Sequence, residues 1–338
     1  MRLSTILRTA LEITQRRRDL WRFGFLIALL GSPMLMNTFM LPPLSGHYLQ
    51  TTSPQAWRTS GWQPPSFWLE LMRRTTPREA RVLTLSLMGA ALLMFAVFYA
   101  FSVRGKAALL RGLLANVNGE MATARELWDE ARRFFWRLVF FPLPAVLIFG
   151  VAMSGLSLFF GALSLRGGTV VGFLLLVPFL IASLGGAWLL SIYFRLGDGA
   201  VALEDLPYWD AISRPWPLWK PHFWWVLLVA FVLSLVQWVV DTVLFYIASA
   251  AMLGLNWLLA IGPSGMVTWF AAHPVVLFLA AFLLMLAGKL MLAVALTPVM
   301  VFITVSWGLL YLGLLERWPV THQGSPAAAP PSTPLPHA

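Results

Sequence analysis

The feature that most constrains the fold of this chain is an apolar run from His222 to Leu315, in which only Asp241 and Lys289 carry a full charge. A single membrane-spanning helix needs only about 20 apolar residues. The whole chain is 59% hydrophobic and 11% charged, whereas soluble domains carry about 25% charged residues. These properties predict an all-α integral membrane protein.

Six hydrophobic segments are long enough to cross a bilayer. They are Phe23–Leu41, Val82–Val103, Leu138–Ala162, Thr169–Phe194, Phe223–Ala251 and Pro274–Leu315. As one helix the last segment would extend about 63 Å, roughly twice the hydrocarbon thickness. It is therefore one kinked helix or two tightly joined spans. We expect one helix with its kink at Pro298, which lacks a backbone donor.

Positive charge is distributed unequally between the two sides of this topology. With six spans and a cytoplasmic N-terminus, 17 of the 24 Lys and Arg residues lie on the cytoplasmic side and 6 on the outer side. Cytoplasmic loops normally carry such an excess, so both termini are expected in the cytoplasm. The contrary signal is a basic group on the outer side, made of Arg73, Arg74, Arg78 and Arg81.

The composition divides the chain into two parts. Residues 1–320 are expected to form one polytopic helical membrane domain. Residues 321–338 are rich in Pro, Ala and Ser and have no periodic apolar face. Because such a segment cannot bury enough apolar surface to fold, it is expected to be a disordered tail.

Three segments that precede spans share a pattern of arginines followed by a tryptophan. They are Thr9–Arg22, Thr123–Arg137 and Asp210–Trp224. In the first two, Thr is followed three residues later by Glu, which is the capping-box signature of a helix N-terminus. We expect three units, each with a short cytoplasmic interfacial helix before a transmembrane hairpin. The third segment is rich in proline, so an irregular aromatic belt is the alternative there.

Arginines in the first two of these segments favour anionic lipid as the partner. Their guanidinium groups can meet lipid phosphates while nearby tryptophans lie at headgroup level. The residues concerned are Arg16, Arg17, Arg18, Arg132 and Arg133. Binding of nucleic acid is not expected, despite a net charge of +10, because basic flanks of spans normally set orientation. A protein partner is the alternative for the Trp-rich third segment.

No motif for catalysis, metal binding or cofactor binding occurs in the sequence. Cysteine is absent, which excludes disulfides and thiolate chemistry. The five histidines are scattered without metal-ligand spacing, and no nucleophile elbow or nucleotide-binding loop occurs. We therefore expect no enzyme activity and no cofactor. A group of acidic residues that follows a span is expected to face the cytoplasm, namely Asp198, Glu204, Asp205 and Asp210.

Asp241 and Lys289 are the costliest residues of the apolar run, because ionisable groups within spans usually pair or line a polar cavity. If the last helix meets the inner interface near Tyr311, the two residues reach a similar height near the outer surface. They can form an intramembrane polar pair, with Gln237 one turn from Asp241. Alternatively, each extends separately to the outer headgroups. A role in transport is the less favoured reading.

The chain resembles a group of uncharacterised bacterial multi-pass membrane proteins, which are related to the membrane domain of some glycerophosphodiester phosphodiesterases. The likeness lies in the run from Arg195 to Asp205 that leads into Ala211 and Trp224, and in Thr297-Pro298 followed by Leu309-Leu310-Tyr311. It covers most of the chain before the tail. The resemblance implies a multi-pass protein of the bacterial cytoplasmic membrane. The soluble phosphodiesterase barrel is missing, so that activity is not expected.

Two classes of function follow from these observations. The favoured one is a non-enzymatic polytopic inner-membrane protein that organises lipid or partner proteins through its cytoplasmic interfacial helices. The alternative is a transporter or permease-like subunit that uses the repeated hairpins. A solute route needs a polar pathway, and within the spans the sequence offers only Gln237, Asp241, Lys289 and scattered Ser and Thr.

Overall fold

The computed structural model describes residues 2–30, 77–261 and 274–316, and every element in these ranges is a helix. In chain order they are α1 (Leu3–Arg16), η1 (Arg18–Leu20), α2 (Trp21–Leu30), α7 (Pro77–Val117), α8 (Ala124–Phe140), α9 (Leu143–Ala202), α10 (Tyr208–Ser213), α11 (Pro215–Trp219), η2 (Lys220–His222), α12 (Phe223–Ile261) and α14 (Pro274–Glu316). Three segments are long and apolar enough to cross a membrane: Leu92–Val117, Tyr208–Ile247 and Leu286–Glu316. The expected tail and the second half of the first expected span lie outside the described ranges.

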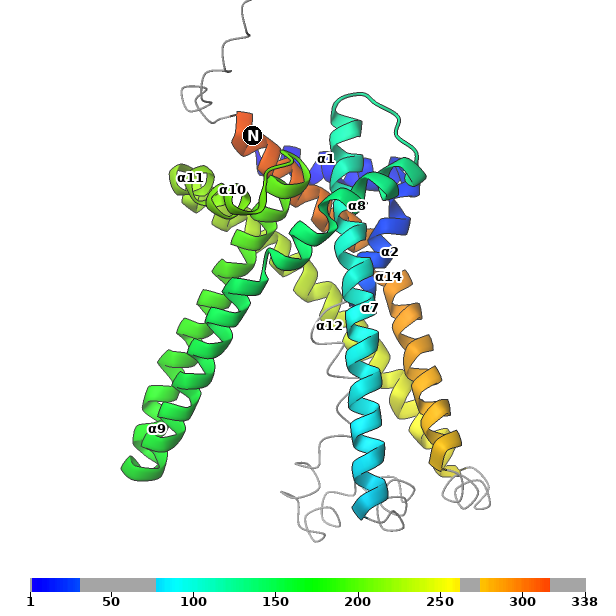
Figure 1. Cartoon of the computed structure of the whole chain (residues 1–338), viewed down its shortest axis with the longest axis vertical. Coiled ribbons are helices and arrows are strands. Elements are labelled where there is room, and N and C mark those ends of the chain that lie inside the picture. Colours follow the sequence, from blue (N-terminus) through cyan, green and yellow to red (C-terminus); the bar gives the residue numbers. More distant parts are fainter. Residues whose placement is uncertain (1, 31–76, 262–273, 317–338) are drawn as a thin grey trace, which may run out of the picture.

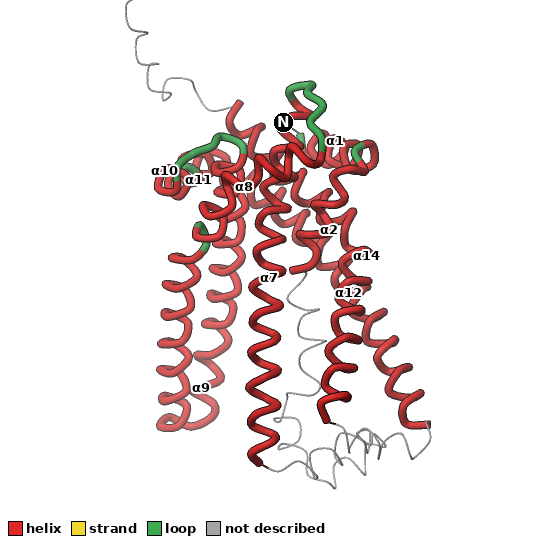
Figure 2. Tube along the Cα trace, turned by 45° about the vertical axis from the view of Figure 1, so that its right-hand side comes forward, coloured by secondary structure: helices red, strands yellow, loops and turns green. Residues whose placement is uncertain are grey.

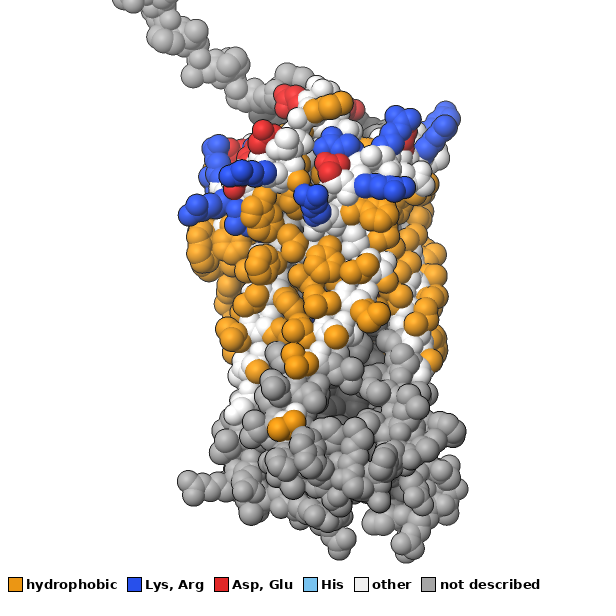
Figure 3. All heavy atoms as spheres, turned by 90° about the vertical axis from the view of Figure 1, so that its right-hand side faces the viewer, with side chains coloured by type: hydrophobic (Ala, Val, Ile, Leu, Met, Phe, Trp, Pro, Cys, Tyr) orange, Lys and Arg blue, Asp and Glu red, His pale blue; other side chains and the backbone are white. Residues whose placement is uncertain are grey.

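The long helices extend in one direction from an end at which the short helices gather. Figure 1 shows α1, α8, α10 and α11 at this end, with α7, α9, α12 and α14 running away from it. Figure 2 shows the same arrangement from a second direction. We call this end of the molecule the charged end, because the basic and acidic side chains on the face drawn in Figure 3 gather there.

Helix α9 doubles back on itself. A straight helix of its 60 residues would extend about 90 Å. Yet the ring of Phe141, just before the helix begins, packs against Phe194 near its end, with ring centroids 5.9 Å apart. Both views show two legs side by side (Figures 1 and 2). The expected segments Leu138–Ala162 and Thr169–Phe194 thus lie mainly on separate legs.

Helix α7 continues well beyond the end of the expected span at Val103 and reaches Val117. The continuation packs against α8, which crosses it and buries one apolar stripe of side chains. These side chains recur at helical spacing and are Leu127, Ala131, Phe134 and Leu138. The apolar stripe of α8 therefore packs against protein.

The expected capping box at the start of α8 is confirmed. The Thr123 hydroxyl accepts a hydrogen bond from the Glu126 backbone N–H, and the Glu126 carboxylate accepts one from the Thr123 backbone N–H. This second bond lowers the pKa of the Glu126 carboxyl below its ordinary value, because it stabilises the charged form. The sequence signature therefore located this helix start correctly.

The same signature at Thr9 and Glu12 was a wrong prediction of a helix start. Helix α1 begins at Leu3, and Thr9 and Glu12 lie inside it. The Glu12 carboxylate pairs with Arg16 one turn later, at 2.8 Å, as mid-helix residues at this spacing do. The helix extends further towards the N-terminus because its buried apolar face begins at Ile6.

The proline-rich third segment is helical but broken into short pieces, α10, α11 and η2. Pro215 and Pro221 lie in the first turn of α11 and η2, where the missing N–H removes no helical hydrogen bond. The prediction of an irregular belt is therefore wrong. The prolines lie at the breaks between the short helices and do not prevent helix formation.

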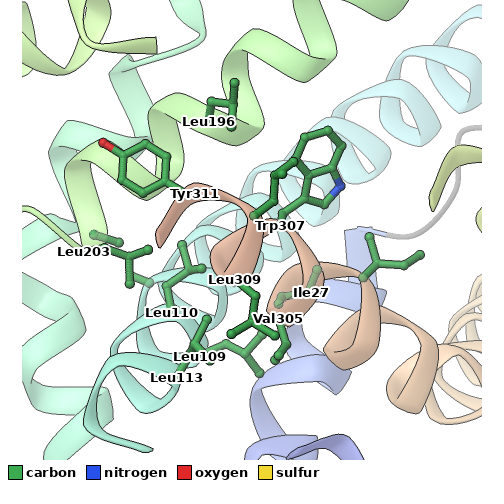
Figure 4. Close-up of a cluster of buried hydrophobic side chains, with 14 of the residues drawn as sticks. Ile27, Leu109, Leu110, Leu113, Leu196, Leu203, Val305, Trp307, Leu309 and Tyr311 are labelled. Carbon is green, nitrogen blue, oxygen red and sulfur yellow. The ribbon is translucent and has the colours of Figure 1, made fainter. Parts of the chain in front are cut away.

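Helix α14 is one helix from Pro274 to Glu316 with Pro298 inside it, so the prediction of a single helix over this segment is confirmed. Its second half forms the centre of the protein core, where it packs on α1, α2 and α7. Figure 4 shows Val305, Leu309 and Tyr311 among side chains from these and neighbouring helices. The close approach of α2 requires a glycine, because Gly24 lies against the Thr297 backbone.

Candidate functional site

The end of α9 and the segment that follows it carry three acidic side chains, each of which binds at least one basic side chain. We call these acids and their basic partners the charged cluster; its members are Asp198, Glu204, Asp205, Lys106, Arg133, Arg137 and Arg214. The cluster lies at the charged end, where α9 leads into α10.

Asp205 binds two arginines of α8. Its carboxylate oxygens lie 2.6 Å from Arg133 and 2.8 Å from Arg137. Arg137 also donates to the backbone carbonyls of Asp205 and Leu206, at 3.4 and 3.3 Å. Asp205 has a φ of 57°, a left-handed conformation that Asp tolerates better than most residues. The turn at the end of α9 is thus attached to α8.

Glu204 connects α10 with α14. Its two carboxylate oxygens accept hydrogen bonds from Arg214 Nε and Nη2, at 3.2 and 2.8 Å, which is the bidentate geometry that makes such pairs strong. The phenol of Tyr311 donates to the same carboxylate. Tyr311 is fully buried and its ring packs on Gly199. The carboxylate therefore accepts from the hydroxyl of a core residue of α14.

Asp198 is buried and binds Lys106 of α7, with 2.8 Å between Oδ2 and Nζ. One turn earlier, Arg195 donates to the side-chain oxygen of Gln237 on α12 at 3.3 Å. The Arg195 guanidinium also lies over the ring of Trp307. That Asp198, Glu204, Asp205 and Asp210 face the cytoplasm stays a prediction, but Asp198 is buried and not solvated. Glu204 and Asp205 are partly buried, and only Asp210 is exposed.

The ion pairs of the charged cluster connect residues of different helices or of the segments that follow them. Each of its three carboxylates binds at least one cation, so none is held free to act as a base. In the ranges that the structure describes, no group of three or more His, Asp or Glu residues could hold a metal ion. The cluster connects α7 and α8 with the end of α9 and with Arg214 after α10, and the Tyr311 hydroxyl adds α14 through Glu204.

The arginines expected to bind lipid fall into two groups. Three are engaged in ion pairs: Arg16 with Glu12, Arg17 with Asp19, and Arg133 with Asp205. The Arg17 guanidinium lowers the pKa of Asp19 by donating hydrogen bonds to its carboxylate. Arg18 and Arg132 are exposed, and no ion pair within the described part of the chain includes them. The binding of anionic lipid by these arginines stays a prediction.

Asp241 and Lys289 are both buried, with 7% and 8% of their surface exposed. They lie on α12 and α14, two helices that contact each other. The Lys289 ammonium donates to the backbone carbonyl of Leu30, the last described residue of α2, at 3.4 Å. Gln237, expected beside Asp241, accepts its hydrogen bond from Arg195. The pairing of Asp241 with Lys289 stays a prediction.

A double-mutant cycle tests that pairing. If the two side chains pair, Asp241→Asn and Lys289→Met should each destabilise the protein, and the double variant should recover part of the loss, because a single change leaves one buried charge unpaired. The free energy of unfolding is measured for all four proteins in mixed detergent micelles. Strict additivity of the two losses would show that the residues act independently.

No motif in the sequence indicates a role for three basic residues of the charged end: Arg104, Lys106 and Arg195. The expected span Val82–Val103 ends just before Arg104 and Lys106 and leaves both outside it. The sequence signal that could have placed Arg104 and Lys106 in a helix is the spacing of the apolar residues around them. Val103, Ala107 and Leu110 recur at helical spacing and are buried. The partners of Arg104 and Lys106 are 24 to 92 residues away in the sequence, so spacing alone could not identify them.

No family model, curated protein or solved structure matches this chain. The resemblance to the membrane domain of glycerophosphodiester phosphodiesterases therefore remains an expectation from the residues quoted for it.

Proposed function

We propose that this chain is a non-enzymatic multi-pass protein of the bacterial cytoplasmic membrane that organises anionic lipid, and through it partner proteins, at its charged end. The single observation that carries the proposal is a band of basic side chains directly above a broad apolar surface, seen on one face in Figure 3. Soluble proteins do not expose so much contiguous apolar surface. A membrane accommodates both the basic band, at its headgroups, and the apolar surface, in its hydrocarbon region.

Six spans are part of the proposal. They comprise the segment that begins with α2, helix α7, the two legs of α9, and helices α12 and α14. Both termini and the charged end are placed in the cytoplasm. The support for this orientation is the excess of Lys and Arg in the segments that lie at the charged end.

Exposed tryptophans near the charged end support an interfacial position. Trp209, Trp216 and Trp224 are exposed, with 75%, 57% and 80% of their surface accessible. They belong to α10, α11 and the first turn of α12. Tryptophan is enriched at headgroup level because its indole has an apolar body and one N–H donor. The short helices α10 and α11 would thus lie along the membrane surface.

Transport is the second candidate function, and one observation favours it. Arg195 and Gln237 form a polar contact between α9 and α12 inside the bundle, and Asp241 is buried further along α12. Ionisable residues within spans often mark ion or substrate paths. Flux assays on proteoliposomes separate the two candidates, because an organising protein moves no solute and does not depend on Asp241.

The test of the lipid role uses membrane patches extracted with an amphipathic polymer, which retains the lipids around the protein. Anionic lipids should be enriched in these patches relative to the bulk membrane. A variant with four exposed arginines replaced by Gln should lose the enrichment; these are Arg18, Arg22, Arg125 and Arg132. A wild-type patch with the composition of the bulk membrane would contradict the proposal.

A further inference from the structure

We propose that Arg104 and Arg132 form a discrete binding site for the phosphate headgroup of one anionic phospholipid, with the apolar surface of α7 below them receiving its acyl chains. This inference rests on the proposed function and deepens it, because it assigns the lipid to named side chains. The site lies where α8 crosses α7, outside the charged cluster. Neither arginine belongs to that cluster.

The Arg104 guanidinium is held in a fixed orientation and still has N–H donors available for a ligand. Its guanidinium lies over the ring of Trp128, 4.1 Å from the centroid. Its Nε and Nη2 donate to the Trp128 carbonyl at 3.2 and 2.9 Å. A guanidinium has five N–H donors, so both N–H groups on Nη1 remain for a ligand. Stacking and two hydrogen bonds thus pre-orient a group that suits phosphate oxygens.

Arg132 supplies the second cation. It lies one helical turn after Trp128 on α8 and is exposed. Its charge is close enough to interact unfavourably with the Arg104 guanidinium, while the carboxylate of Asp129 interacts favourably with the same group. Two cations and one acid leave a net positive charge at the site. An anion between the two guanidinium groups would remove the repulsion.

The surface below the arginines is apolar and suits acyl chains. Leu93, Val97 and Phe101 are exposed and recur every four residues on α7, so they form one face of the helix. Arg104 follows Phe101 by three residues and continues that face. The ring of Phe101 also stacks on Trp128, with 6.5 Å between centroids. The apolar face therefore leads directly to the two cations over about 16 Å.

A phospholipid is favoured over free phosphate because only a lipid would contact both the two guanidinium groups and the apolar face of α7. Free phosphate would bind the guanidinium groups and leave Leu93, Val97 and Phe101 exposed. A diacyl phosphodiester would bind the same groups and cover the apolar face. In the experiment, competition with inorganic phosphate distinguishes these two ligands.

The experiment titrates phosphatidylglycerol into the full-length protein in neutral detergent and counts bound lipid by native mass spectrometry. Each basic residue near an anionic group contributes about 1 kcal/mol. The double variant Arg104→Gln with Arg132→Gln should therefore bind about tenfold to thirtyfold more weakly. Arg132→Gln alone should bind the lipid about fivefold more weakly. Because this change removes no internal hydrogen bond, it still tests the site if the double variant fails to fold. Inorganic phosphate at the same concentration should not displace the lipid.

The matched control is Arg8→Gln, which removes one exposed charge from α1, a helix that carries no residue of the site. Its affinity should stay within about twofold of wild type. An equal loss in Arg8→Gln and Arg132→Gln, or displacement by inorganic phosphate, would overturn the discrete lipid site and leave the proposed function standing. Equal binding of phosphatidylglycerol and phosphatidylcholine by the wild-type protein would overturn both.

Discussion

Gly24→Ala is expected to destabilise the protein by about 3 kcal/mol, because overpacking of a tight helix contact forces the backbone to shift. A methyl group at Gly24 would come within 2.8 Å of the Thr297 carbonyl oxygen and even closer to the Val301 side chain. The carbonyl belongs to the backbone of α14 just before Pro298, and it cannot rotate away as a side chain can. Helices α2 and α14 would have to separate at the centre of the core. The free energy of unfolding in mixed micelles measures the loss.

Gly150→Ala is the matched control for that variant. Gly150 lies on α9, and a methyl group there would meet nothing within 4 Å. Since alanine favours a helix interior over glycine by about 1 kcal/mol, this variant should be as stable as wild type or slightly more stable. Equal stability of Gly24→Ala and Gly150→Ala would show that α2 and α14 do not approach each other as closely as described.

Glu204→Ala is expected to cost about 3 kcal/mol, because it leaves a partly buried arginine and a buried hydroxyl without their acceptor. Glu204 accepts hydrogen bonds from both Arg214 and Tyr311. Its carboxylate and the Arg214 guanidinium are 19% and 25% exposed, so solvent can replace only part of the lost contact. Tyr311→Phe should cost much less in the Glu204→Ala background than in wild type, because its partner is already gone.

Glu12→Ala provides the control, since it breaks an ion pair of similar length on the surface. The pair of Glu12 with Arg16 also has a 2.8 Å separation, but its side chains are 49% and 78% exposed. Exposed pairs at this helical spacing contribute about 0.3–0.5 kcal/mol, so this variant should be almost as stable as wild type. If Glu12→Ala and Glu204→Ala lost the same stability, the charged cluster would have no special role in joining the helices.

The sequence predicted the parts of this fold that depend on local chemistry. Apolar segment lengths located the long helices, and the reciprocal hydrogen bonds of Thr123 and Glu126 located the start of α8. The same motif misplaced the start of α1, because Glu12 has a competing partner in Arg16. A capping signature cannot distinguish a helix start from an internal ion pair when basic residues follow one turn later.

The candidate site depended on contacts that no local pattern contains. Asp198 binds Lys106 across 92 residues, and Arg137 binds Asp205 across 68. From the sequence, Asp198 and Asp205 are expected only to face the cytoplasm, and no partner is indicated for either. Their burial becomes favourable only after α9 doubles back and α8 crosses α7, since a buried charge needs a partner. The tertiary fold therefore decides which acids are paired.

The central claim is that the charged end lies on the cytoplasmic side of the membrane, and the absence of cysteine from the chain allows a direct test. Single cysteines are introduced by Ser4→Cys, Glu120→Cys and Ser213→Cys at exposed sites of the charged end, and by Gly46→Cys and Gly262→Cys in the segments expected outside. A membrane-impermeant maleimide is then applied to spheroplasts and to inverted membrane vesicles. The account predicts labelling of Gly46→Cys and Gly262→Cys in spheroplasts only, and of the other three in inverted vesicles only. Labelling of any charged-end cysteine in intact spheroplasts would contradict it.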